Sequence, residues 1–270
     1  MTIRALLRFE LATMARGRTL TAVAAGFALA SLVVALAGLS AGGVVTVQGF
    51  ARTSLSLLQL VVWTVPMLAL LTGAVAGADT HDVEFLVALP VSRPRLLVAR
   101  WLAHVVALGG ALLAGLGVAG LLLAALAGTG DAARYLALVG VAALLLAATL
   151  ALGLWIGVAA RNRLRAVAGA ALAWLLLVIG ADLIAITLLA VLPAGQAGWG
   201  LSLLLLADPV DSARALGIAL FQATTIAGPT EAALRRVLGG AGVWLLAAGL
   251  VAWTIAPLAL AARRFARSDL

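Results

Sequence analysis

Long uncharged runs, separated by short groups of charged residues, dominate the sequence. Five of these runs carry no charged residue, and a sixth carries only Asp182. Each holds at least about 20 apolar residues, enough for a helix rising 1.5 Å per residue to cross about 30 Å of hydrocarbon. The pattern therefore predicts an all-α integral membrane protein, a single domain over residues 1–270 with six transmembrane helices. The expected spans are 20–40, 55–77, 101–127, 135–159, 166–192 and 241–261.

The segment before the last span, residues 193–240, is expected to be an outer loop that contains a short membrane-associated element. Its uncharged stretch from Ala215 to Thr230 has 16 residues and is interrupted by Gly217, Gly228 and Pro229. Because this stretch is too short to cross the bilayer, we predict a re-entrant or interfacial helix there.

The residues before the first span are amphipathic. Five apolar residues recur on one helical face beside Arg4 and Arg8, a pattern typical of a helix that lies in the plane of the membrane interface. We therefore predict an N-terminal interfacial helix in contact with lipid. The apolar residues are Ile3, Leu6, Leu7, Leu11 and Met14.

The placement of the arginines predicts the orientation. With the N-terminus in the cytoplasm, thirteen of the 18 basic residues fall on the inner side and five on the outer side. Cytoplasmic loops carry the excess of Lys and Arg, so we expect both termini in the cytoplasm of a multi-pass protein of the bacterial inner membrane. The five outer arginines are Arg52, Arg134, Arg214, Arg235 and Arg236.

Composition supports this class and excludes several functions. Hydrophobic residues make up 65% of the chain, charged residues 10%, and the mean hydropathy is +1.21, whereas soluble domains are about 45–50% apolar and about 25% charged. All 18 basic residues are Arg, so the chain has no Lys for a Walker P-loop and cannot hold that nucleotide site. It also has no Cys, which excludes disulfides and thiolate metal sites.

The segment between the second and third spans has the pattern of a rigid element. Asp79 is a candidate N-cap, acidic residues follow in the first turn, and Pro90 ends the helix. One interpretation is a coupling element that docks into a partner and transmits its motion; the other is an ordinary connector. The candidate coupling residues are Asp79, His81, Asp82, Glu84, Phe85, Leu86, Leu89, Pro90, Arg93 and Arg95.

The stretch Phe85-Leu86-Val87-Ala88-Leu89-Pro90-Val91-Ser92-Arg93 resembles the segment after the second span of type-2 ABC exporter permeases. The chain also resembles these permeases in length, in its six spans, in its amphipathic N-terminal helix and in lacking an ATPase domain. The resemblance implies a homodimer bound to two copies of a separate cytoplasmic ATPase that binds ATP and Mg²⁺; this chain itself would need no cofactor. The ATPase would push on residues 79–94 and on Arg161, Arg163 and Arg165.

A second stretch gives a narrower resemblance. Residues 203–214, with the sequence LLLLADPVDSAR, resemble the Leu-rich Asn-Pro-x-Asp-x-x-Arg stretch in copper-processing permeases of nitrous oxide reductase maturation systems; Asp208 stands where that group has Asn. The resemblance implies that Asp208, Pro209, Asp211 and Arg214 contact a periplasmic accessory protein, with the permease as a mechanical relay. The alternative is that these residues only fasten a re-entrant helix pair.

Two polar residues fall inside predicted spans. The helical rise places Asp182 about 25 Å along its helix from Arg165, near the outer surface, and His104 about 6 Å into the third span from the inner side. We therefore expect that they do not pair and do not form a proton relay. Asp182 is either a gate or partner contact at the outer mouth, or a hydrated helix end or interhelical hydrogen bond.

Other motifs are weaker. Gly38-Leu39-Ser40-Ala41-Gly42 matches the nucleophile elbow G-x-S-x-G, but Ser40 is expected at the outer membrane side and both histidines at the inner side. The carboxylates of residues 79–84 suit an exposed helix better than a metal site. Cu⁺ prefers thiolate and thioether ligands, and three methionines give no ligand path across the bilayer. We therefore predict no catalytic site, no metal site and no nucleic-acid partner.

Glycines at four-residue spacing permit close packing of helices, including at a dimer interface. These pairs are Gly38/Gly42, Gly73/Gly77 and Gly153/Gly157.

The predicted function is thus that of an ABC transporter permease in copper-site maturation. Within the same family the alternative is an exporter of a drug, lipid or polysaccharide. From a different class, the alternative is a stand-alone secondary transporter. That class usually shows polar groups near the midplane and broken helices, whereas Pro66 is the one such interruption in the second span.

Overall fold

The computed structural model describes residues 3–16, 18–40, 47–79, 93–220 and 241–266 of the chain. These residues form helices joined by short turns, and no strand occurs among them. The helices are α1 (Ile3–Arg16), α2 (Arg18–Ser40), α3 (Val47–Ala78), α5 (Arg93–Ala127), α6 (Ala132–Ala160), α7 (Arg163–Leu175), the π-helical turn η1 (Leu176–Gly180), α8 (Ala181–Val191), α9 (Ala194–Ala207), α10 (Pro209–Leu220) and α12 (Gly242–Ala266).

Six segments in the described part of the chain are long and apolar enough to cross a membrane, which confirms the predicted fold class. Five are the single helices α2, α3, α5, α6 and α12, and the sixth is the continuous run α7–η1–α8. The helices are longer than the uncharged runs because the helical backbone continues through charged residues that flank those runs. The 35 residues of α5 reach about 52 Å along the helix axis, well beyond the hydrocarbon thickness.

The centre of the molecule is α6, which packs against α3, α5, α7, α10 and α12. It meets α3 through four glycines. A Cβ added to Gly73 would lie 2.7 Å from the carbonyl oxygen of Leu150, and one added to Gly153 would lie 2.5 Å from that of Leu70; Gly77 and Gly157 are equally close to the facing backbone. These two glycine pairs therefore provide the close helix packing that their spacing permits, and they do so between two helices of one chain. The glycines are needed because any side chain would separate the two backbones.

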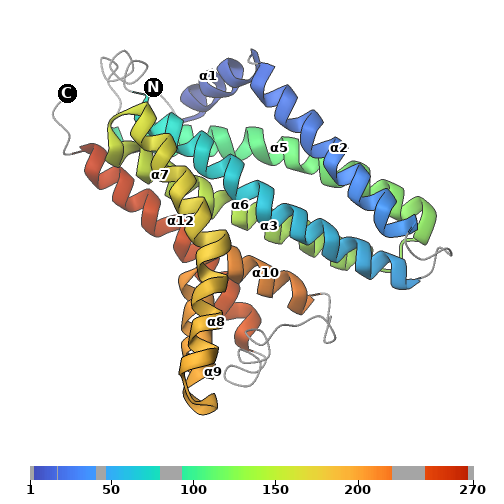
Figure 1. The fold of residues 1–270 in the computed structure, drawn as a ribbon. Coiled ribbons are helices and arrows are strands. Elements are labelled where there is room, and N and C mark those ends of the chain that lie inside the picture. The colour runs from blue at the N-terminus through green and yellow to red at the C-terminus, as the bar shows by residue number, and fades with distance from the viewer. Residues whose placement is uncertain (1–2, 17, 41–46, 80–92, 221–240, 267–270) are drawn as a thin grey trace.

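The N-terminal helix packs on the bundle. α1 contacts the beginning of α5, and Leu6 is buried in a cluster with Leu96, Leu97 and Phe265. Because Phe265 belongs to the last turn of α12, the first and last described helices meet at the same end of the molecule (Figure 1). The predicted helix is present, and its position in the membrane interface stays a prediction.

The predicted outer loop is largely helical in its described part. α8 and α9 form a hairpin that projects from the bundle, and α10 turns back beneath α3 and α6 (Figure 1). The helix predicted over Ala215 to Thr230 in fact begins at Pro209, and residues 221–230 lie outside the described part. Proline suits the first turn of a helix because its missing N–H has no intrahelical partner there.

Candidate functional site

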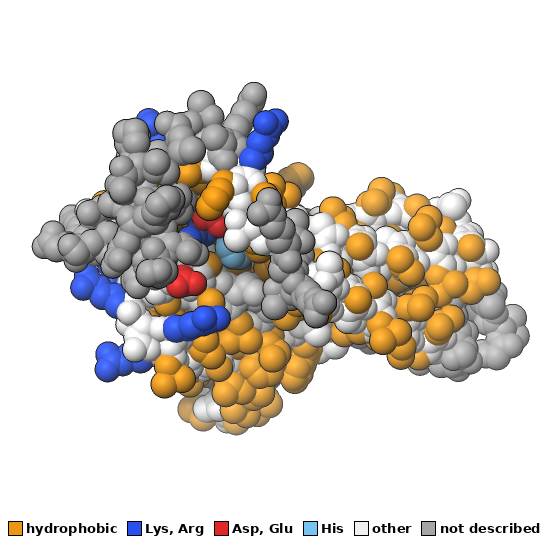
Figure 2. Space-filling model, turned by 90° about the horizontal axis from the view of Figure 1, so that it is seen from above, with side chains coloured by type: hydrophobic (Ala, Val, Ile, Leu, Met, Phe, Trp, Pro, Cys, Tyr) orange, Lys and Arg blue, Asp and Glu red, His pale blue; other side chains and the backbone are white. Residues whose placement is uncertain are grey.

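Two groups of charged residues lie at separate places in the described bundle. We call the first the α10 cluster, consisting of Asp182, Asp208, Asp211 and Arg214. We call the second the Arg-rich end; its arginines are Arg93, Arg95, Arg100, Arg161, Arg163, Arg165, Arg263 and Arg264. Figure 2 shows the basic side chains gathered at one end of the molecule, while the part that extends away from it carries a mostly hydrophobic surface.

The α10 cluster joins two residues that the sequence placed in different elements. The Arg214 guanidinium lies 2.9 Å from Asp211, one turn earlier on α10, and 3.1 Å from Asp182 on α8. The second contact is the interhelical hydrogen bond that was one of the interpretations of Asp182. Nε of Arg214 is buried and has no hydrogen-bond partner among the described residues. The cluster therefore fastens α10 to α8 and leaves one guanidinium donor unused.

Asp208 starts α10. Its carboxylate accepts hydrogen bonds from the backbone N–H groups of Val210, at 2.7 Å, and Asp211, at 3.2 Å, as expected of an N-cap residue. The side chain is buried, with 4% of the residue exposed. Burial, reinforced by the neighbouring Asp211 carboxylate, raises the pKa of Asp208 to about 7, although the backbone N–H groups and Arg214 oppose the shift.

The ionised form of Asp208 is therefore expected to destabilise the folded protein. The pKa in the folded state lies above the usual 3.8, so the stability that this group contributes falls as the pH rises from about 4 to about 7. Asp208→Asn keeps the cap and removes the charge. We predict that it leaves the free energy of unfolding nearly unchanged near pH 4, where Asp208 of the folded wild type is protonated, and raises it at pH 8 by an amount on the order of a few kcal/mol, since one pKa unit is about 1.4 kcal/mol.

Thermal unfolding of the detergent-solubilised protein, followed by tryptophan fluorescence, measures this difference. Asp208→Ala is the control that removes both charge and cap, and it should be less stable than the wild type near pH 4. A lower midpoint for Asp208→Asn than for the wild type at pH 8 would show instead that the carboxylate is stabilising as an anion.

At the Arg-rich end, most of the predicted coupling segment lies outside the described residues. This holds for His81, Asp82, Glu84, Phe85, Leu86, Leu89 and Pro90. Asp79 is described: its backbone N–H donates to Val75 at 3.0 Å, so it follows directly on the end of α3. Arg93 is the first residue of α5, and the side chain of Arg95 is exposed. In the sequence, residues 80–92 thus follow the end of α3 and precede the start of α5.

The turn between α6 and α7 is rigid and basic. Arg161 has a left-handed backbone with φ of 53° and ends α6, and the Asn162 side chain caps α7 by accepting from Leu164 and Arg165 at 2.9 and 3.3 Å. Arg161, Arg163 and Arg165 are all exposed. The turn therefore presents three guanidinium groups on a fixed backbone, which suits docking to another protein.

A buried ion pair at this end was not predicted. Nε of Arg100 lies 3.1 Å from the Glu10 carboxylate of α1, and the exposed fractions of the two side chains are 7% and 13%. Arg100 also donates to the carbonyl oxygen of Ala76 at 2.8 Å, and its own carbonyl lies 2.9 Å from Nδ1 of His104. The pair connects α1, α3 and α5 beside the coupling segment, and it gives His104 a partner other than Asp182. The one available signal was a single acidic residue on a helix otherwise flanked by arginines.

Two sequence comparisons with known proteins identify the family of this chain. Residues 4–270 match the family model described as ABC-2 family transporter protein. The chain belongs to the ABC-2 transporter family. It is 32% identical over 270 residues, covering 96% of both chains, to a protein of Pseudomonas aeruginosa described as a probable ABC transporter permease protein NosY.

Membership of the ABC-2 family makes this multi-pass membrane protein a transporter component. In this ABC-2 permease, the described residues contain no group of three or more side chains suited to hold a metal ion. Ser40 ends α2, whereas His104 lies on α5 next to Arg100, and Gly42 and His81 lie outside the described part.

Proposed function

We propose that this chain is the membrane subunit of an ABC transporter in nitrous oxide reductase copper-site maturation, driven by a separate cytoplasmic ATPase. The observation that carries the proposal is the family match over residues 4–270 in a chain without a single Lys. Because a P-loop needs a Lys, nucleotide hydrolysis must come from a partner. The likeness to the NosY permease and the LLLLADPVDSAR stretch support the maturation role.

The proposed assembly is a homodimer of this chain with two ATPase subunits, which hold ATP and Mg²⁺. It sits in the bacterial inner membrane with both termini cytoplasmic, an orientation supported by the excess of arginine at one end. This places the Arg-rich end toward the ATPase and the α10 cluster toward the periplasm. The exposed Arg161, Arg163 and Arg165 and residues 79–95 are then the docking surface for the ATPase.

The helix α3 provides the mechanical connection between the coupling segment and the α10 cluster. It ends at Ala78, next to Asp79 of the coupling segment, and Leu58 lies about 30 Å away along the same helix. There Leu58 packs on α10: a Cβ added to Gly217 would lie 2.7 Å from the methyl groups of Leu58. Since α3 is also locked to α6 by glycines, a push at Asp79 moves α10 and its ion cluster as one unit.

A mechanical relay fits the chemistry better than passage of copper through this chain. Cu⁺ sites use thiolate and thioether ligands, and the chain has no Cys and three Met. We propose that Asp208, Pro209, Asp211 and Arg214, held at the end of the relay, act on a periplasmic accessory protein, with Asp182 completing the contact.

Purification of the full chain in mild detergent from its native membrane tests the assembly. We expect a P-loop ATPase to co-purify in equimolar amount, together with a periplasmic protein. Recovery of the chain alone, with transport activity after reconstitution into vesicles without any added subunit, would contradict the proposal. Recovery of the ATPase with an export activity for a drug, lipid or polysaccharide would favour the exporter alternative.

Charge reversal tests the coupling segment. We predict that Asp82→Lys combined with Glu84→Lys uncouples the assembly, so that ATP hydrolysis no longer drives transport or maturation while the protein still inserts into the membrane. The reason is that reversed charges would repel a docking surface complementary to the acidic turn. The measurement is ATPase activity and maturation yield at equal membrane abundance.

Asp131→Lys is the matched control for this experiment. Asp131 pairs with Arg134 at 2.8 Å just before α6, far along the chain from the coupling segment, and the exposed fraction of the Arg134 side chain is 46%. An exposed pair of this kind contributes less than about 1 kcal/mol, so coupling should stay intact. Equal activity of the double variant and the wild type would exclude a coupling role for Asp82 and Glu84.

A further inference from the structure

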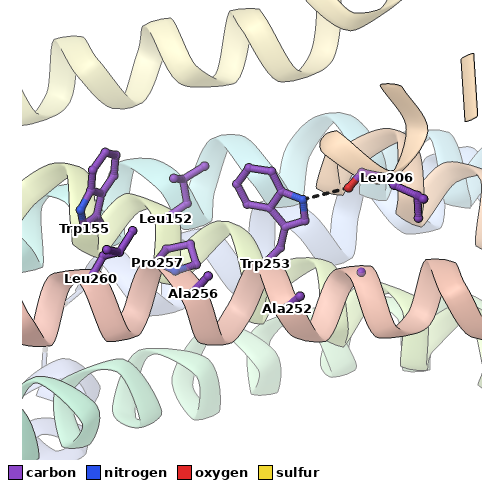
Figure 3. Close-up of a pocket in the computed structure, with 9 residues that line it drawn as sticks. Leu152, Trp155, Leu206, Ala252, Trp253, Ala256, Pro257 and Leu260 are labelled. Atoms are coloured by element: carbon purple, nitrogen blue, oxygen red, sulfur yellow. Dashed lines mark hydrogen bonds between the residues drawn. The ribbon is translucent and has the colours of Figure 1, made fainter. Parts of the chain in front are cut away.

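An apolar groove of about 470 Å³ runs between α6 and α12. Leu152 and Trp155 come from α6, residues 249–260 supply the α12 side, and Leu206 at the end of α9 closes one end. Figure 3 shows Trp155 and Leu260 at one end of the groove, Trp253 beside Leu206 at the other, and Pro257 between them. The volume is that of a typical small-ligand site.

The groove has the dimensions and surface of a site for a hydrocarbon chain. The lining residues Gly249 to Leu260 extend about 16 Å along α12. Ala252, Ala256 and Leu260 are exposed, so the groove opens at the side of the helix pair instead of being sealed in the core. The one polar edge of Trp253 is already satisfied, because its Nε1 donates to the carbonyl oxygen of Leu206 at 3.3 Å. Its ring is therefore left to contact an apolar ligand.

Positively charged arginine residues lie at one end of this groove. Arg264 follows Leu260 by one helical turn, and its Nη2 donates to the carbonyl oxygen of Ala159, one turn after Trp155, at 3.4 Å. The guanidinium thus bridges α12 and α6 where the groove ends. It has five N–H donors, of which this bond uses one.

The same end holds further arginines. Arg263 is adjacent on α12, and Arg161 ends α6 two residues after Ala159. The described ion pairs involve Arg100, Arg134 and Arg214, and no described carboxylate pairs with Arg161, Arg263 or Arg264. Among the described residues, the end of the groove therefore carries an excess of positive charge.

We propose that this groove binds an anionic membrane phospholipid, with an acyl chain along Trp155, Trp253 and Leu260 and the phosphate at Arg264, assisted by Arg161 and Arg263. The groove has an apolar lining and, at one end, arginines that form no ion pair with a described carboxylate. It is therefore complementary to an amphiphile with a hydrocarbon tail and an anionic head. Basic sites between transmembrane helices bind anionic head groups in this way. The site shares Arg161 with the proposed docking surface for the ATPase, but Arg264 and the groove residues belong neither to that surface nor to the α10 cluster, so variants at those positions test the lipid site independently of the proposed role in maturation.

Native mass spectrometry of the full chain in detergent tests the site directly. Phosphatidylglycerol and phosphatidylcholine with identical acyl chains are each titrated into delipidated protein, and the apparent dissociation constants are compared. We expect a clear preference for phosphatidylglycerol in the wild type. Arg264→Gln should weaken phosphatidylglycerol binding about fivefold and phosphatidylcholine binding by less, because the choline cation already neutralises the phosphate of that lipid. Arg134→Gln, which removes an exposed arginine from the start of α6, is the matched control and should change neither.

A second pair of variants tests the apolar part. Ala256→Trp fills the groove and should abolish retention of both lipids at the site, whereas Val251→Trp, on the opposite face of α12 and 43% exposed, should not. Equal affinity for the two lipids in the wild type, or no effect of Ala256→Trp, would overturn the proposal. Loss of a chain dimer in the Ala256→Trp variant, with lipid binding unchanged, would show that a second copy covers the groove and would equally contradict it.

Discussion

Gly157→Leu is expected to abolish accumulation of folded protein. In the wild type, a Cβ at this position would already touch the carbonyl oxygen of Ala74 and lie 2.8 Å from the Cα of Gly77. A leucine side chain cannot be accommodated unless α3 and α6 separate, and these helices form the most buried part of the bundle. We also expect the smaller change Gly157→Ala to destabilise the protein by about 1–3 kcal/mol, the usual cost of overpacking.

Gly140 provides a control on the same helix, because no atom lies within 4 Å of a Cβ added there. Gly140→Leu should give folded protein, and Gly140→Ala should raise stability slightly, by up to about 1 kcal/mol, because alanine favours the helix. The measurement is the thermal midpoint in detergent by size-exclusion chromatography after heating. Opposite signs for the two alanine substitutions are the decisive result; the same sign would mean that α3 and α6 can readily separate.

Arg100→Ala is the second large expected effect. It would leave the Glu10 carboxylate buried beside α5 without the guanidinium that now lies 3.1 Å away, and it would also remove the bond to Ala76. Breaking a buried ion pair by removing one partner costs about 3–5 kcal/mol. Loss of this pair should therefore detach α1 from the bundle, and proteolysis within residues 3–16 should accelerate.

The exposed pair of Arg134 and Asp131 supplies the comparison for this variant. Arg134→Ala should cost less than about 1 kcal/mol. Removing both buried charges, with Arg100→Met and Glu10→Gln together, should recover most of the stability lost in Arg100→Ala. If the single variant is no less stable than Arg134→Ala, then α1 is held by apolar contacts such as Leu6 alone.

The spans could be predicted because the length of an uncharged, apolar run decides whether it can cross the bilayer as a helix. A run without charges and longer than about 20 residues has no stable alternative to a membrane helix, and all six such runs are helical in the described part of the chain. The ends of the helices were less predictable, since backbone hydrogen bonds continue past the last apolar residue. In α5 the helix begins eight residues before the predicted span.

Pairings between distant residues could not be derived from the pattern. Asp182 and Arg214 are 32 residues apart, and Glu10 and Arg100 are 90 apart. The helical rise gives a depth for each residue but not the face that it turns to its neighbours. Glycine spacing showed in the same way that close packing was possible, and the structure was needed to show that α3 and α6 of one chain use it.

The π-helical turn at Leu176–Gly180 determines which way the second half of the fifth span faces. An additional residue within a turn rotates everything beyond it by about 100° relative to a regular helix. Without that offset the carboxylate of Asp182 would sit on a different side of α8, out of reach of Arg214. The register between the two halves of the molecule thus depends on a single wide turn within otherwise regular apolar sequence.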